Sequence, residues 1–580
     1  MVCGSFCTLR TIAGMYTKTG ISVSEALLSP EKCKKFVRRI RENLLLENIE
    51  IQNTYTIGRT RTALFHNELW TQMLQHLHLQ SISLHNTNCI PREAQQYGGN
   101  AACNALRELS ITYCPMSLSS VSWLQNTFVS HTRLQKLVLS DNGMTDASIR
   151  VLCDMLHRNG SVTYLDVSSN NFGSEAVSLL CGVLTAGSDA CKLNTLVVES
   201  NHLCDPGASL LAEALHSNTR LLVLNVKSNN IGPRGMVQLL NMLQHNTTLH
   251  TLSMANNDHA WATQQLLHTV LRSNTTLCSL DVSMLMDVSV LKDSVDDSNH
   301  AIDVAELLQA SLHIRHIQLD GVHTSTGAIV RVRQLLAHNT SLHRISFAEC
   351  GLTLCDANEL AVGIGQNIGI QHLDLSNNQL CASVKRRHSN GVLNATFWDA
   401  LGRNTTLQVL LLGGNLLGTE SMWHAASFVA GHATLLRLDI PDNKIGNIGA
   451  LVLLHAIARN TSLQQLDLRR NATYSVSFSQ LLSTLVKTRI CAQRNHGLYV
   501  HGIALFVTTC EMRVFRRSRT HAAMQITKKD LLEIWTDDCH ARKTAFLLFT
   551  CARLYRGTLS QLCGDSLRMI LSFNILHTIS

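Results

Sequence analysis

A strand–turn–helix unit of about 28 residues recurs through most of this 580-residue chain, and this period constrains the fold more than any other feature. In the copy at residues 221–246, Leu221, Leu224 and Val226 have the spacing of a strand, and Asn229 follows. Apolar residues then recur with the i, i+3, i+4, i+7 spacing of an amphipathic helix: Met236, Leu239, Leu240 and Leu243. Neither element can bury its apolar side alone, so the copies must stack.

The strand template is regular from Leu106 onward, and its first apolar residue recurs every 28 residues, apart from one interval of 31 and two of 37. The thirteen regular copies begin at Leu106, Leu134, Val162, Leu193, Leu221, Leu249, Leu277, Ile314, Leu342, Ile370, Leu407, Leu435 and Leu463. Degenerate copies at Leu46 and Leu79 bring the candidate strands to fifteen. The sequence therefore predicts a solenoid over residues 46–490, with about 15 repeats.

The unit resembles the leucine-rich repeat, L-x-x-L-x-L-x-x-N/C-x-L, and its length is similar to that of the ribonuclease-inhibitor subclass. The N/C position holds Asn142, Asn170, Asn201, Asn229, Asn257, Asn378, Asn415, Asn443 and Asn471, or Cys114 and Cys350. The resemblance implies an α/β fold: a right-handed solenoid, or horseshoe, with a parallel sheet on the concave face and helices on the convex face. It also implies that these side chains form a ladder of hydrogen bonds to the backbone of adjacent turns, interrupted near residues 277–322, where Leu285 and Val322 depart from the pattern.

Residues 1–45 precede the first expected strand and are interpreted as an N-terminal helical cap. Ser29, Pro30 and Glu31 have the pattern of a helix start. The apolar residues that follow share one helical face, which would cover the open end of the core: Phe36, Val37, Ile40 and Leu44. The alternative is a basic surface for acidic lipid, nucleic acid or an import receptor.

Residues 491–580 are interpreted as a C-terminal cap or linker and a helical tail. Residues 497–509 are apolar enough for a terminal strand, and residues 526–580 have helical patterning. The tail weakly resembles short F-box-like or effector-type tails, in which a leucine-rich helix pair follows a turn. It could therefore be a plain cap or a docking module.

The nineteen cysteines are scattered, odd in number and without CxxC spacing. Several fall where the repeat requires a small buried residue, such as Cys153 and Cys181, so we expect reduced core thiols and no metal site. N-x-S/T triplets recur just past the predicted helices, at Asn246, Asn274, Asn339, Asn404 and Asn460. Their fixed position in the repeat indicates structural turns, because asparagine tolerates the left-handed conformation that ends a helix.

The N-terminal residues lack the apolar core of a signal peptide, and no apolar run is long enough to span a membrane. We therefore expect an intracellular, cytoplasmic protein, with delivery into a host cell as an alternative. The sequence contains none of the phosphate-binding loop, nucleophile-elbow, zinc-protease or kinase motifs. We expect no enzymatic activity, no cofactor and no small-molecule substrate.

The residues between the strand leucines should point away from the core and form columns across adjacent strands. These columns are small and neutral in the N-terminal half of the chain, whereas acids alternate with arginine and histidine in the C-terminal half. The candidate partner-binding residues are His316, Arg344, His372, Asp374, Arg437, Asp439 and Asp467. An internal alternative is that Arg437 and Arg469 neutralise Asp439 and Asp467.

Both 37-residue repeats carry an insertion of about nine residues between strand and helix, which places both on one rim. Residues 284–299 are acidic and residues 381–391 are basic, so the two could clamp a partner or could be solvated loops.

The favoured function is a non-enzymatic scaffold that binds a partner protein on its concave sheet. One alternative is a substrate-recognition adaptor, of the ubiquitin-ligase type or a host-directed effector, that uses the tail as a second docking site. The other is a GTPase-activating regulator. The net charge of +8 is small for this length, so nucleic acid is not an expected partner.

Overall fold

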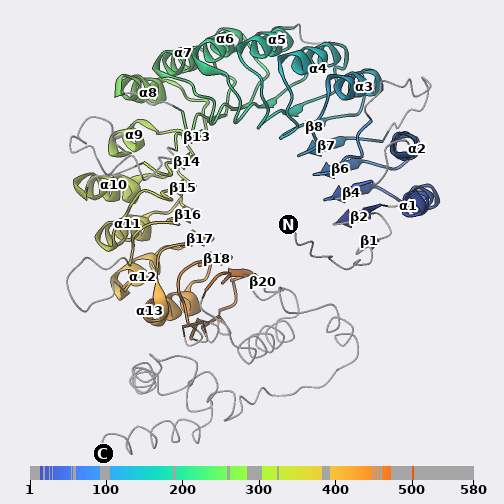
Figure 1. Ribbon diagram of the computed structural model, residues 1–580. Helices are drawn as coiled ribbons and strands as arrows, with labels where there is room; N and C mark the ends of the chain where they lie inside the picture. The colour runs from blue at the N-terminus through green and yellow to red at the C-terminus, as the bar shows by residue number, and fades with distance from the viewer. Residues whose placement is uncertain are drawn as a thin grey trace, which may run out of the picture. The chain divides into compact units, whose positions relative to one another are not determined.

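The computed structural model describes most of the repeat region (Figure 1). The described residues are 14–16, 20–24, 27–28, 30–53, 55–56, 61–91, 105–186, 191–257, 261–283, 304–322, 326–381, 392–446, 449–450, 452–453, 456–457, 460–471 and 499–501. The chain divides into two compact units. The first comprises Met1–Ile302 with Ala310–Ile314, and the second Asp303–Gln309 with Arg315–Ser580.

The first unit is a mainly parallel sheet lined on one side by helices (Figure 1), and β3 and β5 form a separate two-stranded sheet. Its strands are β1 (Gly14–Tyr16), β2 (Gly20–Ser24), β3 (Leu27–Leu28), β4 (Asn48–Gln52), β5 (Tyr55–Thr56), β6 (Ser81–His85), β7 (Glu108–Thr112), β8 (Lys136–Val138), β9 (Tyr164–Asp166), β10 (Thr195–Val197), β11 (Val223–Asn225), β12 (Thr251–Ser253) and β13 (Ser279–Asp281). Its helices are α1 (Pro30–Glu42), α2 (Arg61–Gln75), α3 (Leu118–Phe128), α4 (Asp146–Arg158), α5 (Ser174–Thr185), α6 (Cys204–His216), α7 (Pro233–Leu243) and α8 (Trp261–Ser273).

The second unit repeats this arrangement. Its strands are β14 (His316–Gln318), β15 (Arg344–Ser346), β16 (His372–Asp374), β17 (Val409–Leu411), β18 (Arg437–Asp439), β19 (Gln465–Asp467) and β20 (Tyr499–His501). Its helices are α9 (Val304–Ala310), α10 (Thr326–His338), α11 (Leu354–Gln366), α12 (Ala395–Leu401) and α13 (Gly418–Gly431). The α/β solenoid that the repeat predicts is confirmed in both units.

Each repeat buries the residues that its sequence pattern assigns to the core. In the copy at residues 221–246, Leu224 and Val226 are fully buried, and the central residue of most strands is buried between two more exposed neighbours. The helix side contributes the apolar face of α7, where Met236, Leu239, Leu240 and Leu243 are all at most 2% exposed. The two apolar surfaces meet between sheet and helices, as the 2-residue and 3.6-residue periods require.

An asparagine ladder runs through each unit along the turn that follows the strands. In the first unit, the backbone N–H of Asn142 donates to Oδ1 of Asn170, that of Asn170 to Asn201, and that of Asn201 to Asn229, each at 3.1 Å. The same bonds link Asn378, Asn415, Asn443 and Asn471 in the second unit. The predicted ladder is confirmed, and it satisfies buried turn amides that the strands and helices leave unpaired. Leu285 lies outside the described residues.

A second asparagine ladder lies at the turns that follow the helices. The amide of Asn246 donates to Leu215 O at 2.7 Å, and its Oδ1 accepts from the backbone N–H groups of Thr248 and Leu249. Equivalent bonds are made by Asn159, Asn274, Asn367, Asn404 and Asn460. The structural role predicted for these triplets is confirmed, but the predicted reason is wrong. A positive φ is found at none of the five triplet asparagines, Asn246, Asn274, Asn339, Asn404 and Asn460, so the amide bonds, not a left-handed backbone, select asparagine.

The N-terminal strand corrects one expectation. Residues 1–45 were expected to precede the first strand, but β2 pairs in parallel with β4, and β1 pairs antiparallel with β2. The repeat pattern did not predict β2, because its sequence, GISVS, lacks the leucines that define the strand template. Helix α1 follows as expected and buries Phe36, Val37 and Ile40, whereas Leu44 lies beyond the helix and is 75% exposed.

At the other end, the terminal strand predicted within residues 497–509 is confirmed, because β20 pairs in parallel with β19. Three other predictions fall outside the described residues: the acidic insertion at 284–299, nearly all of the basic insertion at 381–391, and the helical tail at 526–580.

The cysteines of the described residues are free thiols, most of them buried. Burial raises the pKa of Cys153, Cys181 and Cys350 to about 12, whereas Cys204 and Cys355 are exposed. Because the thiolate is the reactive form, iodoacetamide at pH 8 should label Cys204 and Cys355 in the folded protein and the three buried thiols only after unfolding. Peptide mass mapping measures this, and equal labelling rates at all five cysteines would contradict the assigned burial.

Candidate partner-binding surface

The candidate residues all lie on β14–β19 of the second unit, and the sheet register aligns them. One column runs His316, Arg344, His372, Val409, Arg437 and Gln465, and its neighbour runs Gln318, Ser346, Asp374, Leu411, Asp439 and Asp467. The predicted columns are therefore present. We call the side of the sheet that carries them the strand face.

Two of the predicted acids are neutralised within the strand face. Arg437 forms a bidentate pair with Asp439 on its own strand, with Nε–Oδ2 and Nη2–Oδ2 distances of 2.9 and 2.5 Å. Arg469 holds Asp467 in the same way at 2.9 and 2.5 Å, and Asp467 is only 2% exposed. The internal pairing that the sequence left open is therefore present. It leaves Asp467 little surface for a partner, whereas the Arg437 side chain stays 47% exposed.

A second group consists of His316, Arg344 and His372, which occupy adjacent positions on β14, β15 and β16. We call this group the cationic column. Burial lowers the pKa of both histidines, and the positive charge of Arg344 lowers it further. Arg344 itself is exposed and forms no ion pair with any described residue. The cationic column therefore offers one guanidinium without an ion pair to any described residue, between two histidines whose pKa is lowered.

Asp374 stands beside the cationic column and is partly buried. Its Oδ1 accepts a hydrogen bond from the backbone N–H of Ser376 at 2.8 Å. Burial raises the pKa of its carboxyl group, and the negative charges of Asp320 and Asp439 add to this effect. Asp320 is bound by Gln318 at 2.6 Å and by the Ser346 hydroxyl.

The sequence-based selection missed two residues that shape this electrostatic field. Arg315 and His343 each precede a strand by one position, and their charges contribute to the lowered pKa of His316. The repeat pattern could have identified Arg315 and His343, because they lie 28 residues apart at the same repeat position. The serine that ties Asp320 to the sheet, Ser346, could not be identified without the register.

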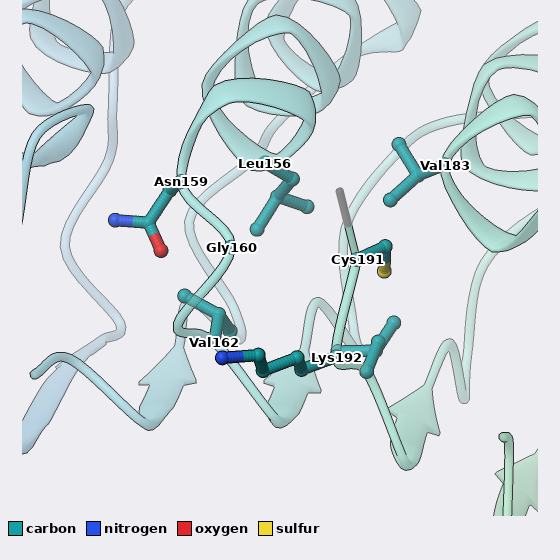
Figure 2. A pocket seen from close by; sticks show the side chains of 8 residues that line it. Leu156, Asn159, Gly160, Val162, Val183, Cys191 and Lys192 are labelled. Carbon is teal, nitrogen blue, oxygen red and sulfur yellow. The ribbon is translucent and has the colours of Figure 1, made fainter. Parts of the chain in front are cut away.

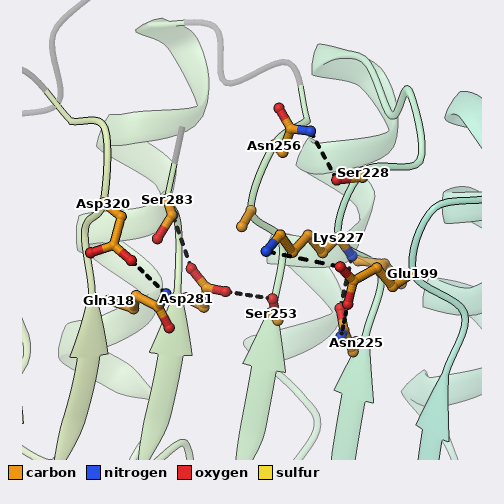
Figure 3. A network of polar contacts seen from close by, with 12 residues as sticks. Glu199, Asn225, Lys227, Ser228, Ser253, Asn256, Asp281, Ser283, Gln318 and Asp320 are labelled. Atoms are coloured by element: carbon orange, nitrogen blue, oxygen red, sulfur yellow. Dashed lines mark hydrogen bonds and ion pairs between the residues drawn. The ribbon is translucent and has the colours of Figure 1, made fainter. Parts of the chain in front are cut away.

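The strand face of the first unit satisfies its own charges (Figure 3). Glu199 accepts a hydrogen bond from Asn225 at 2.9 Å and pairs with Lys227 at 3.9 Å. Asp281 accepts from the Ser253 hydroxyl at 2.8 Å. These side chains of neighbouring repeats stabilise one another.

A pocket between two repeats of the first unit offers no better site (Figure 2). It is lined by Leu156, Asn159, Gly160, Val162, Val183, Cys191, Lys192 and Leu193. Its empty volume of about 210 Å³ is partly open to solvent, below the roughly 300 Å³ of a typical ligand pocket. The amide of Asn159 is already bound to Phe128 O and His131 O, so its donors are not free for a ligand.

Neither a cluster of metal-ligating side chains nor a helix long and apolar enough to cross a membrane occurs among the described residues. For the part of the chain that the structure describes, the charged columns are therefore the best-defined candidate site.

Comparisons with known proteins identify the same repeat. The family model described as Leucine Rich repeat matches residues 158–181, 217–240 and 431–454. Ribonuclease inhibitor from Sus scrofa is 25% identical over 372 residues, which cover 63% of this chain and 76% of that protein. "NACHT, LRR and PYD domains-containing protein 5" from Mus musculus is 23% identical over 259 residues, 38% of this chain, and the match spans 21% of that relative's length. The solved structure of the yeast Rad7 and Elc1 complex shares 13% identity at a TM-score of 0.41, and the match covers 81% of this chain and 92% of that one.

Proposed function

Because this chain is a leucine-rich-repeat protein with ribonuclease-inhibitor-like repeats, we propose that it binds a partner protein on the strand face of its second unit. The observation that carries the proposal is the in-register array of charged side chains on β14–β19, opposite the helix layer. Stacked repeats of this kind present extended surfaces of aligned side chains, which suit a large rigid partner. The function is binding and not catalysis.

Charge on such a surface acts mainly on partner choice and on the rate of encounter. Arg344 and Arg437 are the exposed cations of the array, and Asp374 and Asp439 are its partly buried acids. A partner that presents the opposite pattern would replace water at these groups with charge-assisted hydrogen bonds. A partner with the same pattern would be rejected by like charges, which provides specificity.

The test reverses one charged pair without breaking it. In the double variant Arg437→Glu with Asp439→Lys, the pair on β18 can still form, so folding should be preserved while the polarity of the surface is inverted. Affinity capture from cells of the source organism, quantified by mass spectrometry, should recover a partner with the wild type. The amount of that partner captured by the variant should be at least tenfold lower. Arg403→Glu, an exposed turn residue after α12, is the matched control and should retain the partner.

If the charge-swap variant captured the same proteins as the wild type, the partner would bind at a surface other than the strand face of the second unit. The adaptor alternative depends on the tail at 526–580, and that segment lies outside the described residues. No described feature favours a GTPase-activating role over simple binding. The free thiols of the described residues support a reducing, intracellular location.

A further inference from the structure

We propose that the cationic column of His316, Arg344 and His372 is the subsite that receives an acidic segment of the partner protein, with a carboxylate bound to the Arg344 guanidinium. This inference rests on the proposed function and assigns its chemistry. Its observations are the register of three strands, the exposure of Arg344 and the absence of a counter-ion for Arg344 among the described residues.

The geometry suits one carboxylate. Adjacent parallel strands lie about 4.8 Å apart, so the three side chains form a row about 10 Å long. Arg344 stands at the centre of this row, between His316 and His372 on the neighbouring strands. A guanidinium binds a carboxylate through two parallel N–H···O bonds, and its position between two histidine rings keeps the row polar. Nδ1 of His372 is buried and has no hydrogen-bond partner among the described residues, so Arg344 is the group that meets the carboxylate directly.

The contrast with the other arginines of the strand face explains why Arg344 is available. Arg437 is followed two residues later by Asp439, and Arg469 is preceded two residues earlier by Asp467, so each arginine is paired on its own strand. At the corresponding position after Arg344 stands Ser346, whose hydroxyl donates to Asp320. The repeat that could have neutralised Arg344 has a hydroxyl where the others have a carboxylate.

The charges around the cationic column favour a protein segment over nucleic acid. Asp374 lies on the same strand as His372, and Asp439 lies two strands farther on in the neighbouring column. A nucleic-acid backbone, which carries regularly spaced phosphates, would bring negative charge against these acids as well. A protein segment can place a glutamate or aspartate at Arg344 and a neutral or basic residue at Asp374.

The histidines couple this binding to pH. The groups that lower the pKa of His316 besides burial are Arg344, His343 and Arg315, and for His372 they are Arg344, His316 and Arg437. A bound carboxylate counteracts Arg344 and raises the pKa of both histidines, so binding takes up protons. Affinity should therefore increase as the pH falls from 7.5 towards 6.0, a range in which glutamate remains ionised.

The probe is a fluorescein-labelled hexaglutamate peptide, with a hexalysine peptide and a single-stranded oligonucleotide of equal charge as comparisons. Fluorescence anisotropy on the full chain at low ionic strength should show saturable binding of hexaglutamate, weakened at least tenfold by Arg344→Glu and unaffected by Arg403→Glu. The double variant His316→Gln with His372→Gln should bind at pH 7.5 but lose the increase at pH 6.0. Thermal unfolding verifies that each variant is folded.

Three results would overturn the inference: no hexaglutamate binding, an equal loss with Arg403→Glu, or tighter binding of the oligonucleotide. Failure here is distinguishable from failure of the proposed function. If the captured partner is lost with the Arg437→Glu and Asp439→Lys swap but retained by Arg344→Glu, the strand face binds a protein and the cationic column is not its acidic subsite.

Discussion

Replacement of Asn229 by alanine should lower the free energy of unfolding by about 3–5 kcal/mol, although Asn229 is not one of the candidate partner-binding residues. Asn229 is fully buried, and its Oδ1 accepts the backbone N–H of Asn201 at 3.1 Å. Its amide N–H groups donate to Val198 O, Val226 O and Lys227 O at 2.9–3.0 Å. Alanine would leave one buried donor and several carbonyls without this partner, and each unpaired buried group costs about 1–3 kcal/mol.

The measurement is chemical denaturation followed by far-UV circular dichroism, which reports the loss of helices and strands. Asn241→Ala is the matched control, because Asn241 is exposed on α7 in the same repeat. Alanine has a higher helix propensity than asparagine, so this control should be neutral or slightly stabilising. A loss from Asn229→Ala no larger than that of the control would mean that the ladder contributes little to stability.

The ladder was predictable from the sequence because its asparagines recur at a fixed position in nine of the thirteen regular repeats. The buried leucines of strand and helix were also predictable, because they recur with the 2-residue and 3.6-residue periods that place them on one face of each element. The triplets after the helices were located correctly, but the reason given for Asn246 was wrong. Sequence position showed that asparagine is required there, but only the bonds to the preceding repeat showed why.

The candidate surface was only partly predictable. The order of residues along each column follows from the repeat length, so the placement of Arg344 between two histidines could be derived. Whether Arg437 turns towards Asp439 or towards a partner depends on side-chain geometry that the repeat pattern does not contain. For the same reason, Asp467 and Arg344 were equal candidates by sequence, although Asp467 is paired and buried and Arg344 is exposed and forms no ion pair with a described residue.

Replacement of Gly363 by alanine should cost about 3 kcal/mol of unfolding free energy, because helix α11 lacks room for even one methyl group towards α10. A Cβ at Gly363 would lie 2.6 Å from Arg333 O and 3.0 Å from Arg333 Cα, both backbone atoms of α10. Backbone of a packed helix cannot rotate away as a flexible side chain can, so the two helices would have to separate. Gly365 meets the backbone of Ala400 in α12 in the same way, so glycine sets the approach of α11 to both neighbours.

Gly431→Ala separates this steric effect from the general effect of replacing glycine in a helix. Gly431 is the last residue of α13, and a Cβ there would meet nothing within 4 Å. The control should be neutral or stabilising by about 0.5 kcal/mol, because alanine reduces the entropy of the unfolded chain. Thermal unfolding of both variants measures the difference. If Gly363→Ala proved as stable as Gly431→Ala, α10 and α11 would have to tolerate a wider spacing, and the alignment of β14–β16, on which the cationic column depends, would not be fixed by close helix packing.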